Sequence, residues 1–411
     1  MKKTLFILFT VSLFHNFASG QWVQQNSGTT GDLNSVYFAD DLTGWVCGVT
    51  GSSSTDRIAK TTDGGITWIK QNAGTYYVLN SIQFINKQTG WAAGIHGIIV
   101  KTTNGGENWL PILFVPSADW YTVQFLNENT GWVSGTSDLV YRTTNGGTNW
   151  NTSQNNTGGI RIFFADANTG YLVASAFNGK ISKSTNGGIN WMQSGINSQA
   201  LPCIHFINKD TGWIAGDPSL VYVTLNGGTN WIQYSISSVL TGPRSIVFTN
   251  TLTGYICGIA GIIFKTSNGG INWNNQNSNL STNLKDIFFI NNITGWSVGE
   301  SGIIIKTTNG GGTVGVNTIS IEKPTEFVLF QNYPNPFNPV SMITFHLPVS
   351  SEVVLKLFDM TGRYVQTILK QALAAGIYET EINSEGLSSG VYFYRIETER
   401  FTDTKKMIVL R

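Results

Sequence analysis

The sequence predicts an all-β protein: a seven-bladed β-propeller closed by its N-terminal strand, followed by a small C-terminal β-sandwich. Three observations support this fold. A nine-residue segment, first seen at Lys60–Trp68, recurs at steps of 40 to 42 residues. Alternating apolar and polar residues fill the intervals, and helical periodicity is absent. The residues after an N-terminal leader read like the end of a repeat, as expected of a ring that closes on itself.

The repeated segment, called the box below, contains a polar residue, two glycines and then a tryptophan. The polar residue is Asp63 in the first copy and asparagine in the others, at Asn104, Asn145, Asn186, Asn226, Asn268 and Asn309. A tryptophan follows five positions later in six copies, at Trp68, Trp109, Trp150, Trp191, Trp231 and Trp273. The seventh copy has Val314 there, and Trp22 begins a run that resembles the one after Trp68. Trp22 is therefore expected to complete the last blade.

The residue types of the box indicate a turn. Consecutive glycines permit the positive φ angles of a tight hairpin. The Asp or Asn side chain is expected to bond backbone amides two residues on, and the tryptophan to bury its ring between neighbouring blades. Because only Asp63 carries a charge, a structural turn is favoured over a calcium loop, which needs several carboxylates. We expect neither a metal nor a cofactor.

The rest of each repeat supplies the remaining strands of a blade. An alternating strand such as Leu33–Phe38 or Leu79–Phe84 comes first. A turn follows that ends in Thr-Gly-Trp or Thr-Gly-Tyr, with its glycine at Gly44, Gly90, Gly131, Gly170, Gly212, Gly254 and Gly295. The second and third strands precede the box, and the fourth begins at the box tryptophan. The propeller is assigned to residues 21–312.

Composition limits the function. The chain has 411 residues with 25 basic and 24 acidic side chains, and this near-neutral balance argues against a nucleic-acid partner. Cys47, Cys203 and Cys257 are an odd number, and we expect buried, unpaired thiols.

The N-terminus predicts export. Lys2 and Lys3 precede an apolar run and then small residues, so residues 1–20 are assigned as a signal peptide. No later stretch reaches the length of a transmembrane helix, and none is expected in the mature chain.

The C-terminal region differs in composition. Residues 313–326 are assigned to a polar linker and residues 327–411 to a β-sandwich. Strands are expected over Ile343–Leu347, Val353–Phe358, Ile377–Ile382 and Val391–Ile396, with a turn at Asp359–Gly362. Ahead of them lies the proline-rich run Asn332-Tyr-Pro-Asn-Pro-Phe-Asn-Pro339, which is expected to be extended and outside any central strand.

Two family resemblances follow from these motifs. The box resembles the Asp-box of sialidases, sortilin-type receptors and xyloglucan-cleaving hydrolases. The whole repeat, over residues 22 to 312, looks most like the photosystem II assembly and stability factor family. That resemblance implies a propeller fold and, as one alternative, a role in assembling a membrane complex.

The C-terminal region resembles the type A sorting domain of the type IX (Por) secretion system. The residues that carry this resemblance include Asn332, Pro334, Asn335, Pro336, Phe337, Pro339, Lys405 and Lys406. It implies the secretion machinery as a partner. It also implies passage through the periplasm and outer membrane of a Gram-negative bacterium, with release or surface attachment after removal of the domain. Considered alone, Lys405 and Lys406 fit a solvated strand edge.

Candidate functional residues are few. The histidines share no ligand spacing, and no nucleophile elbow or phosphate loop is present. A sialidase needs three clustered arginines, whereas the propeller holds only Arg57, Arg142, Arg161 and Arg244 without the accompanying motif.

Loops on one propeller face carry the remaining candidates. Asp138, Asp217 and Glu300 fall between second and third strands, which a propeller places on the same face. Tyr76, Tyr77 and Trp120 are predicted in connections between blades on that face, where Phe114 joins them. Exposed aromatic rings beside acids suit a sugar or peptide ligand. Packing of the rings between blades is an equally good interpretation.

The function that the sequence favours is an exported, non-catalytic propeller that binds a protein or glycan at the cell surface or outside. The first alternative is a carbohydrate-active hydrolase that uses the loop acids, since a glycosidase needs paired carboxylates facing one cleft. The second is the assembly-factor role implied by the family resemblance. The sequence names no specific ligand.

Overall fold

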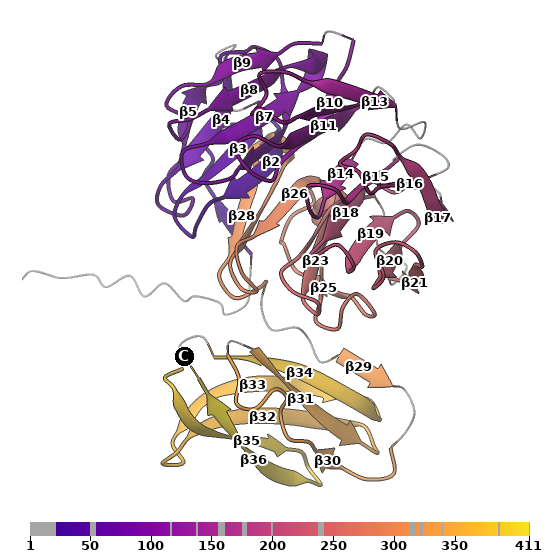
Figure 1. Cartoon of the computed structure of the whole chain (residues 1–411). Coiled ribbons are helices and arrows are strands. Elements are labelled where there is room, and N and C mark those ends of the chain that lie inside the picture. The colour runs from indigo at the N-terminus through magenta and orange to yellow at the C-terminus, as the bar shows by residue number, and fades with distance from the viewer. Residues whose placement is uncertain are drawn as a thin grey trace, which may run out of the picture.

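The computed structural model describes residues 22–49, 55–115, 117–136, 139–154, 161–174, 179–198, 200–236, 242–311, 317–320, 324–338, 340–384 and 387–410. Asp138, Pro339 and the predicted signal peptide lie outside these ranges. The described part is almost entirely strand, in nine four-stranded sheets. Seven sheets form the propeller and two form the C-terminal domain (Figure 1). The predicted all-β architecture is confirmed.

Blades 1 to 3 follow one another along the chain, and the strands of each blade run outward in sequence order. Blade 1 contains β2 (Leu33–Phe38), β3 (Gly44–Gly48), β4 (Asp56–Thr61) and β5 (Ile69–Asn72). Blade 2 contains β6 (Leu79–Phe84), β7 (Gly90–Gly94), β8 (Ile99–Thr102) and β9 (Leu110–Leu113), with the short 3-10 helix η1 (Ile95–Gly97). Blade 3 contains β10 (Trp120–Phe125), β11 (Gly131–Gly135), β12 (Leu139–Thr143) and β13 (Asn151–Gln154).

Blades 4 to 6 repeat this order. Blade 4 contains β14 (Arg161–Phe164), β15 (Gly170–Val173), β16 (Gly179–Ser184) and β17 (Met192–Ser198). Blade 5 contains β18 (Cys203–Phe206), β19 (Gly212–Gly216), β20 (Leu220–Thr224) and β21 (Ile232–Ser235). Blade 6 contains β22 (Pro243–Phe248), β23 (Gly254–Gly258), β24 (Ile263–Thr266) and β25 (Asn274–Gln276), with the 3-10 helix η2 (Ile259–Gly261).

Blade 7 joins the two ends of the propeller. It contains β26 (Leu284–Phe289), β27 (Gly295–Gly299) and β28 (Ile304–Thr307), with η3 (Glu300–Gly302), and its outer strand is β1 (Val23–Gln25). β1 pairs antiparallel with β28, with Val23 opposite Lys306 and Gln25 opposite Ile304. In Figure 1 the orange strands of blade 7 accordingly lie beside the indigo strands of blade 1. The N-terminal strand therefore closes the ring, as the sequence predicts.

Every blade junction is filled by three aromatic rings. A Phe at the end of an inner strand stacks face to face on a Trp or Tyr from the second strand of the preceding blade, at centroid distances of 3.5 to 3.8 Å. A box tryptophan meets the other side of the Phe edge-on, at 5.7 to 6.1 Å. The triads are Trp296–Phe38–Trp68, Trp45–Phe84–Trp109, Trp91–Phe125–Trp150, Trp132–Phe164–Trp191, Tyr171–Phe206–Trp231, Trp213–Phe248–Trp273 and Tyr255–Phe289–Trp22.

The triads explain why the turn that ends in Thr-Gly-Trp or Thr-Gly-Tyr needs a glycine. A Cβ atom added at Gly44 would lie 2.5 Å from the Phe38 ring, and the same holds at 2.3 to 2.6 Å for the six equivalent glycines. No side chain fits there, because the Phe ring lies directly on the glycine backbone. The glycine and the Phe are therefore two parts of one packing arrangement.

The box forms a turn by a wider hydrogen-bond pattern than the sequence predicts. Asp63 accepts from the Thr67 amide four residues on, at 2.9 Å, rather than from an amide two residues on. The Thr61 hydroxyl accepts from the amides of Asp63 and Gly65. The reason is that both glycines have positive φ, +73° at Gly64 and +94° at Gly65, so the loop is broad and the side chain spans it. The Asn boxes have the same geometry. In the second copy, for example, Asn104 Oδ1 accepts from the Asn108 amide.

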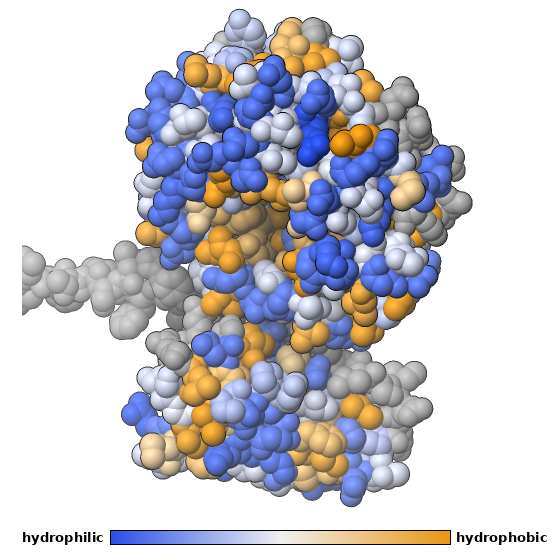
Figure 2. Space-filling view, in the orientation of Figure 1, coloured by the Kyte–Doolittle hydropathy of each residue, from blue (hydrophilic) through white to orange (hydrophobic). Residues whose placement is uncertain are grey.

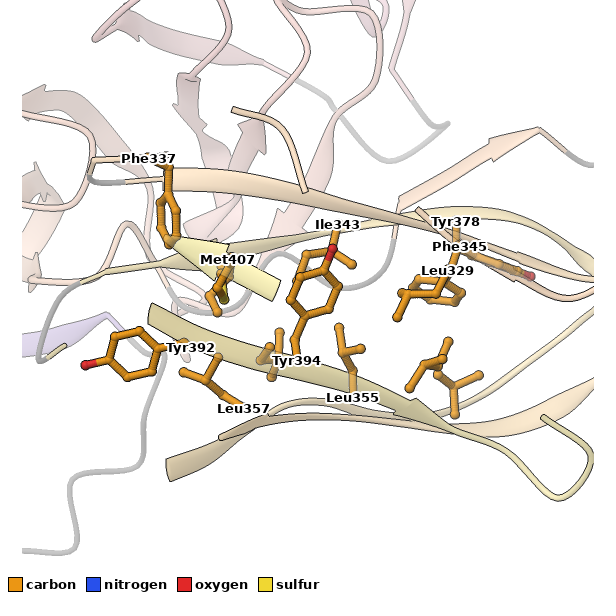
Figure 3. Packing of buried hydrophobic residues seen from close by; sticks show 14 of the residues in the cluster. Leu329, Phe337, Ile343, Phe345, Leu355, Leu357, Tyr378, Tyr392, Tyr394 and Met407 are labelled. Carbon is orange, nitrogen blue, oxygen red and sulfur yellow. The ribbon is translucent and has the colours of Figure 1, made fainter. Parts of the chain in front are cut away.

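The C-terminal domain is a sandwich of two sheets. One has the order β29 (Asn317–Ser320), β34 (Gly376–Asn383), β31 (Val340–Leu347) and β30 (Val328–Leu329). The other has the order β33 (Tyr364–Leu373), β32 (Ser351–Asp359), β35 (Gly390–Glu397) and β36 (Thr402–Val409). Between them, Ile343 and Phe345 of the first sheet face Leu355 and Tyr394 of the second (Figure 3). β29 lies in the stretch assigned to a linker but pairs with β34, so residues 317–320 belong to this sheet.

The closing strand gives a first prediction. Trp22 is 3% exposed and completes the seventh triad. Trp22→Ala should lower the free energy of unfolding by about 3–5 kcal/mol because it leaves a ring-sized cavity at the closure. Urea unfolding of the mature chain measures the change. Val23→Ala is the control, since Val23 is 61% exposed in the same strand and its truncation should cost less than about 0.5 kcal/mol. Equal midpoints for the two variants would contradict the closure.

An interblade histidine gives a second prediction. His205 hydrogen-bonds to the Phe248 backbone of the next blade, and burial lowers its pKa to about 4 despite that bond. Below about pH 6.5 the His205 imidazole is protonated in the unfolded chain but stays neutral in the folded chain. The free energy of unfolding therefore falls as the pH drops from about 6.5 towards 4. The expected loss is about 1–3 kcal/mol, measured by urea unfolding at pH 7 and pH 4.5.

The matched variant is His205→Gln. Gln83 and Gln124 occupy the same position in blades 2 and 3, where each amide bonds the backbone of the next blade. Glutamine should therefore keep the stability at pH 7 and flatten the pH dependence. An unchanged slope between pH 6.5 and pH 4 would show that another group causes the acid sensitivity.

Candidate functional site

The inner strands line a polar pocket at the mouth of the central channel, here called the central pocket. Its volume is about 360 Å³. The lining residues are Asn34, Asn80, Tyr121, Arg161, Arg244, Asn283, Lys285 and Glu300. The inner strands of blades 1, 2, 3, 4, 6 and 7 contribute six of them, and Glu300 comes from η3. The pocket lies on the face that holds the connections between blades and the loops between second and third strands.

Register explains why these side chains converge. Asn34, Asn80, Tyr121, Arg244 and Lys285 are each the second residue of an inner strand. The first residue of these strands is buried, as at Leu33, Leu79 and Leu284, so alternation turns the second residue towards the axis. Arg161 lies one residue further along, at the position that Ser35, Ser81, Thr122, Cys203, Ser245 and Asp286 occupy in the other blades.

Hydrogen bonds link the pocket residues from blade to blade. The Lys285 ammonium donates to Asn34 Oδ1 at 3.0 Å, and Asn34 Nδ2 donates to Asn80 Oδ1 at 3.3 Å. Asn80 in turn donates to the Trp120 carbonyl at 2.9 Å. Lys285 also pairs with Asp32 at 2.9 Å. Burial acts to raise the pKa of Asp32, but Lys285 and the Ser301 amide hold it below the ordinary value. Lys285 is thus neutralised within the wall.

The two arginines give the pocket its charge. Neither Arg161 nor Arg244 forms an ion pair with a described residue. Glu300 is the one carboxylate in the lining, and it accepts from Asn283 Nδ2 at 3.0 Å. Two unpaired guanidinium groups against one carboxylate leave an excess of positive charge, with the planar donors that suit an anionic group.

A second carboxylate supports the channel without lining the pocket. Asp286 Oδ2 accepts from the Ser35 hydroxyl at 2.8 Å and from the Val36 amide at 3.0 Å. Its Oδ1 accepts from the Ser245 hydroxyl at 2.8 Å. Asp286 therefore links blades 1, 6 and 7, and both of its carboxylate oxygens are engaged in these hydrogen bonds.

The two described acids among those predicted from sequence, Asp217 and Glu300, do not gather at the central pocket. Glu300 lines the central pocket, whereas Asp217 is absent from the lining and accepts from the Gly242 amide at 2.9 Å. Asp138 lies outside the described residues. Within the described residues, no three His, Cys, Asp or Glu side chains group as metal ligands, and no helix is long and apolar enough to cross a membrane.

The predicted aromatic residues divide into two groups. Tyr76, Tyr77, His96 and Phe114 form a cluster on the same face, called the aromatic patch, in which Tyr77 contacts the other three rings. Tyr76 is 66% exposed and Phe114 is 50% exposed. Trp120, by contrast, is fully buried in β10 against Tyr141, so its predicted place on the binding surface is wrong. Its ring instead packs within the blade.

Sequence reasoning missed Lys285 and Asp286 as site residues, and it considered Arg161 and Arg244 only among the arginines that a sialidase would need. The repeats nevertheless contain a pattern that identifies these residues. Aligning the inner strands on their terminal Phe places these residues at the two positions nearest the channel axis.

The sorting motif is built into the C-terminal sandwich. Asn332 is 2% exposed and donates to Ser341 Oγ at 2.8 Å and to the Pro334 carbonyl at 3.1 Å. Asn335 donates to the Lys406 carbonyl and accepts from the Ile408 amide, beside edge strand β36. Phe337 is buried in the core. Pro336 lies between these two anchored residues, while Lys405 pairs with Asp403 and Lys406 is exposed.

Comparison with known proteins agrees with this two-part architecture. A family model described as photosynthesis system II assembly factor YCF48 matches residues 14–161 and 154–280. A model described as a secretion system C-terminal sorting domain matches residues 331–410. No curated protein matches the chain in sequence.

Solved structures share the propeller fold. One titled "YCF48 bound to D1 peptide" is 20% identical with a TM-score of 0.59, over 72% of this chain and 98% of its own. YCF48 from Cyanidioschyzon merolae is 20% identical with a TM-score of 0.58, over 70% and 98%. The WD40 propeller domain of Doa1 is 12% identical with a TM-score of 0.55, over 71% and 97%. Because the two matches of the first model together span more than half of the sequence, the chain belongs to the photosynthesis system II assembly factor YCF48 family, and it carries a secretion-system C-terminal sorting domain.

Proposed function

We propose that the chain is an exported binding protein whose central pocket takes an acidic peptide segment of a partner protein. The observation that carries the proposal is the convergence of Arg161 and Arg244, without ion pairs, on a pocket of about 360 Å³. Charge-assisted bonds from planar guanidinium groups favour carboxylates, including a free chain terminus. A relative of the same fold has been solved with a peptide, which supports this class of ligand.

The C-terminal domain supports a place of action outside the inner membrane. We infer that residues 1–20 direct export to the periplasm and that the C-terminal domain is then recognised by type IX machinery at the outer membrane. The protein would be released or attached to the cell surface. The family description names an assembly factor for a photosynthetic complex, but a sorting domain favours a client beyond the outer membrane.

We propose binding rather than hydrolysis at this face. A glycosidase requires two carboxylates on either side of one bound sugar. Of the described loop acids, Glu300 lines the pocket and already accepts from Asn283, while Asp217 is bonded to the Gly242 amide. These contacts support structural roles for both acids.

Removal of the two arginine charges tests the peptide site. The probes are a fluorescent ten-residue peptide with acidic side chains and a free carboxyl terminus, and an amidated peptide with lysine in place of each acid. Arg161→Gln with Arg244→Gln should weaken binding of the acidic peptide about 100-fold or more, because each lost charge-assisted bond contributes about 1.5–3 kcal/mol. Fluorescence anisotropy measures the affinities at low and high salt.

Arg363→Gln is the control, since Arg363 is an exposed arginine in a turn of the C-terminal domain. It should leave the affinity unchanged. Equal affinities for the acidic and the lysine peptide, or no effect of the double variant, would overturn the proposal.

The aromatic patch supports a second candidate, the binding of a glycan. Tyr76 and Phe114 expose large ring surfaces, and Arg57 fixes the Tyr76 backbone with two bonds of 3.0 and 2.8 Å to its carbonyl. Rings held in this way suit stacking on sugar faces.

Tyr76→Ala tests the glycan candidate. On a glycan array the variant should lose any signal that the wild-type protein gives, because a stacking surface is removed. Its melting temperature should stay unchanged, because the ring is mostly exposed. Ile66→Ala is the control, since Ile66 is 75% exposed but lies in a box turn. A wild-type array without signal would exclude the second candidate.

A further inference from the structure

Six blades carry a cation at the same position of the third strand, opposite the Trp or Tyr of the second strand. These residues are Lys60, Lys101, Arg142, Lys183, Lys265 and Lys306. In three blades the ammonium donates to the first box glycine of the following blade: Lys101 to Gly146 at 3.1 Å, Lys183 to Gly227 at 2.6 Å and Lys306 to Gly64 at 3.1 Å. The cation thus normally serves the junction with the next blade.

Lys265 of blade 6 departs from this pattern. Its Nζ lies 3.3 Å from Glu381 Oε2 and 3.4 Å from Oε1, and Glu381 belongs to β34 of the C-terminal domain. Lys265 is 1% exposed, whereas the other five cations are half-buried. Glu381 is buried almost as completely, with 11% of its side chain exposed. A lysine buried to this degree needs a partner of opposite charge, and for Lys265 that partner is a carboxylate of the other domain.

The neighbouring tyrosine explains why Lys265 is free for this role. Tyr255 donates to the Asn292 carbonyl at 2.9 Å and lies 3.4 Å from the Gly310 carbonyl, which is the acceptor equivalent to those used by the other lysines. Blade 4 has the same Tyr–Lys pair, but there Tyr171 bonds only the Lys209 carbonyl and Lys183 takes Gly227. Blade 4, which has no domain against it, is therefore an internal reference for blade 6.

A cleft of about 620 Å³ lies between the two domains beside this ion pair, and Glu381 is part of its lining. Blade 6 contributes Asn250 to Thr253 and the box residues Asn268 and Ile271. The C-terminal domain contributes Tyr333, Pro334 and Asn338 of the sorting motif and the edge of β34. Figure 2 shows the C-terminal domain against this side of the propeller. Ile271 and Tyr333 remain 48% and 81% exposed, so most of the contact is open, whereas the ion pair is a buried polar link within it.

We propose that blade 6 is a docking surface for the chain's own C-terminal sorting domain, held by the Lys265–Glu381 ion pair. The docked domain holds its Asn332–Asn338 segment along the cleft, at a fixed position relative to the folded propeller. Because most of the contact is open, docking is reversible. Once the domain is removed, Lys265 becomes equivalent to Lys183, with the Gly310 carbonyl as its acceptor.

Zero-length cross-linking of the full mature chain tests this inference. A carbodiimide joins an amine to a carboxylate only where the two are in contact. The expected products are a Lys265–Glu381 link between the domains and a Lys356–Glu397 link within the C-terminal domain, where the two groups lie 2.6 Å apart. The second link is the positive control. Small-angle scattering of the same sample gives the separation of the domains.

Matched variants separate docking from folding. Lys265→Met should abolish the interdomain link, keep the internal one and increase the radius of gyration, while Lys183→Met should leave all three unchanged. Glu381→Gln repeats the test from the other domain, where no part of the propeller is altered. Absence of the Lys265–Glu381 link beside a clear Lys356–Glu397 link would overturn the proposal. The same conclusion would follow if scattering of Glu381→Gln matched that of the wild-type protein.

Discussion

The aromatic triad at each blade junction is the interaction on which the propeller depends. A Phe ring lies between an indole or phenol of the preceding blade and a box tryptophan of its own blade, and the geometry repeats with little variation around the ring. With 12% aromatic and only 12% charged residues, the chain relies on this packing more than on ion pairs. The adjacent glycine is fixed by the same contact, since the ring occupies the place of its side chain.

The seventh triad shows how a linear repeat becomes a closed ring. Its edge-on tryptophan, Trp22, comes from the far end of the propeller sequence and packs on Phe289. The junction between blades 7 and 1 is then built like the others, with Trp296 stacked on Phe38 and donating to the Gly64 carbonyl. Asp286 adds a polar tie near the axis to three blades. Closure thus uses the ordinary blade contacts and needs no special element.

The sequence predicted the fold well because its signals are local and repeated. Box spacing, strand alternation and the displaced Trp22 each indicate the propeller independently. The failures arise where three-dimensional context decides. Trp120 reads as a connection residue, yet the blade buries it, and residues 317–320 read as a linker, yet β29 finds an open edge of β34. The Asp63 side chain bonds four residues on because two left-handed glycines widen its turn.

The central pocket was harder to foresee, because it is assembled from single residues about 40 positions apart. Asn34, Arg244 and Lys285 look ordinary in their own strands, and only the closed ring brings them together. The loop acids were easier to see, but loops on one face need not converge. Of the two described loop acids, Asp217 bonds its neighbouring loop and Glu300 reaches the pocket.

Different positions of the inner strand have different roles, and this has an evolutionary consequence. The Phe that ends each inner strand is committed to the junction, whereas the second residue of the strand, at Asn34, Asn80, Tyr121, Arg244 or Lys285, takes no part in any triad. Substitutions at that position change the pocket lining and its hydrogen bonds between blades, but they leave the aromatic triads intact. Gene duplication followed by drift at these few sites would therefore yield paralogues with one shape and many specificities.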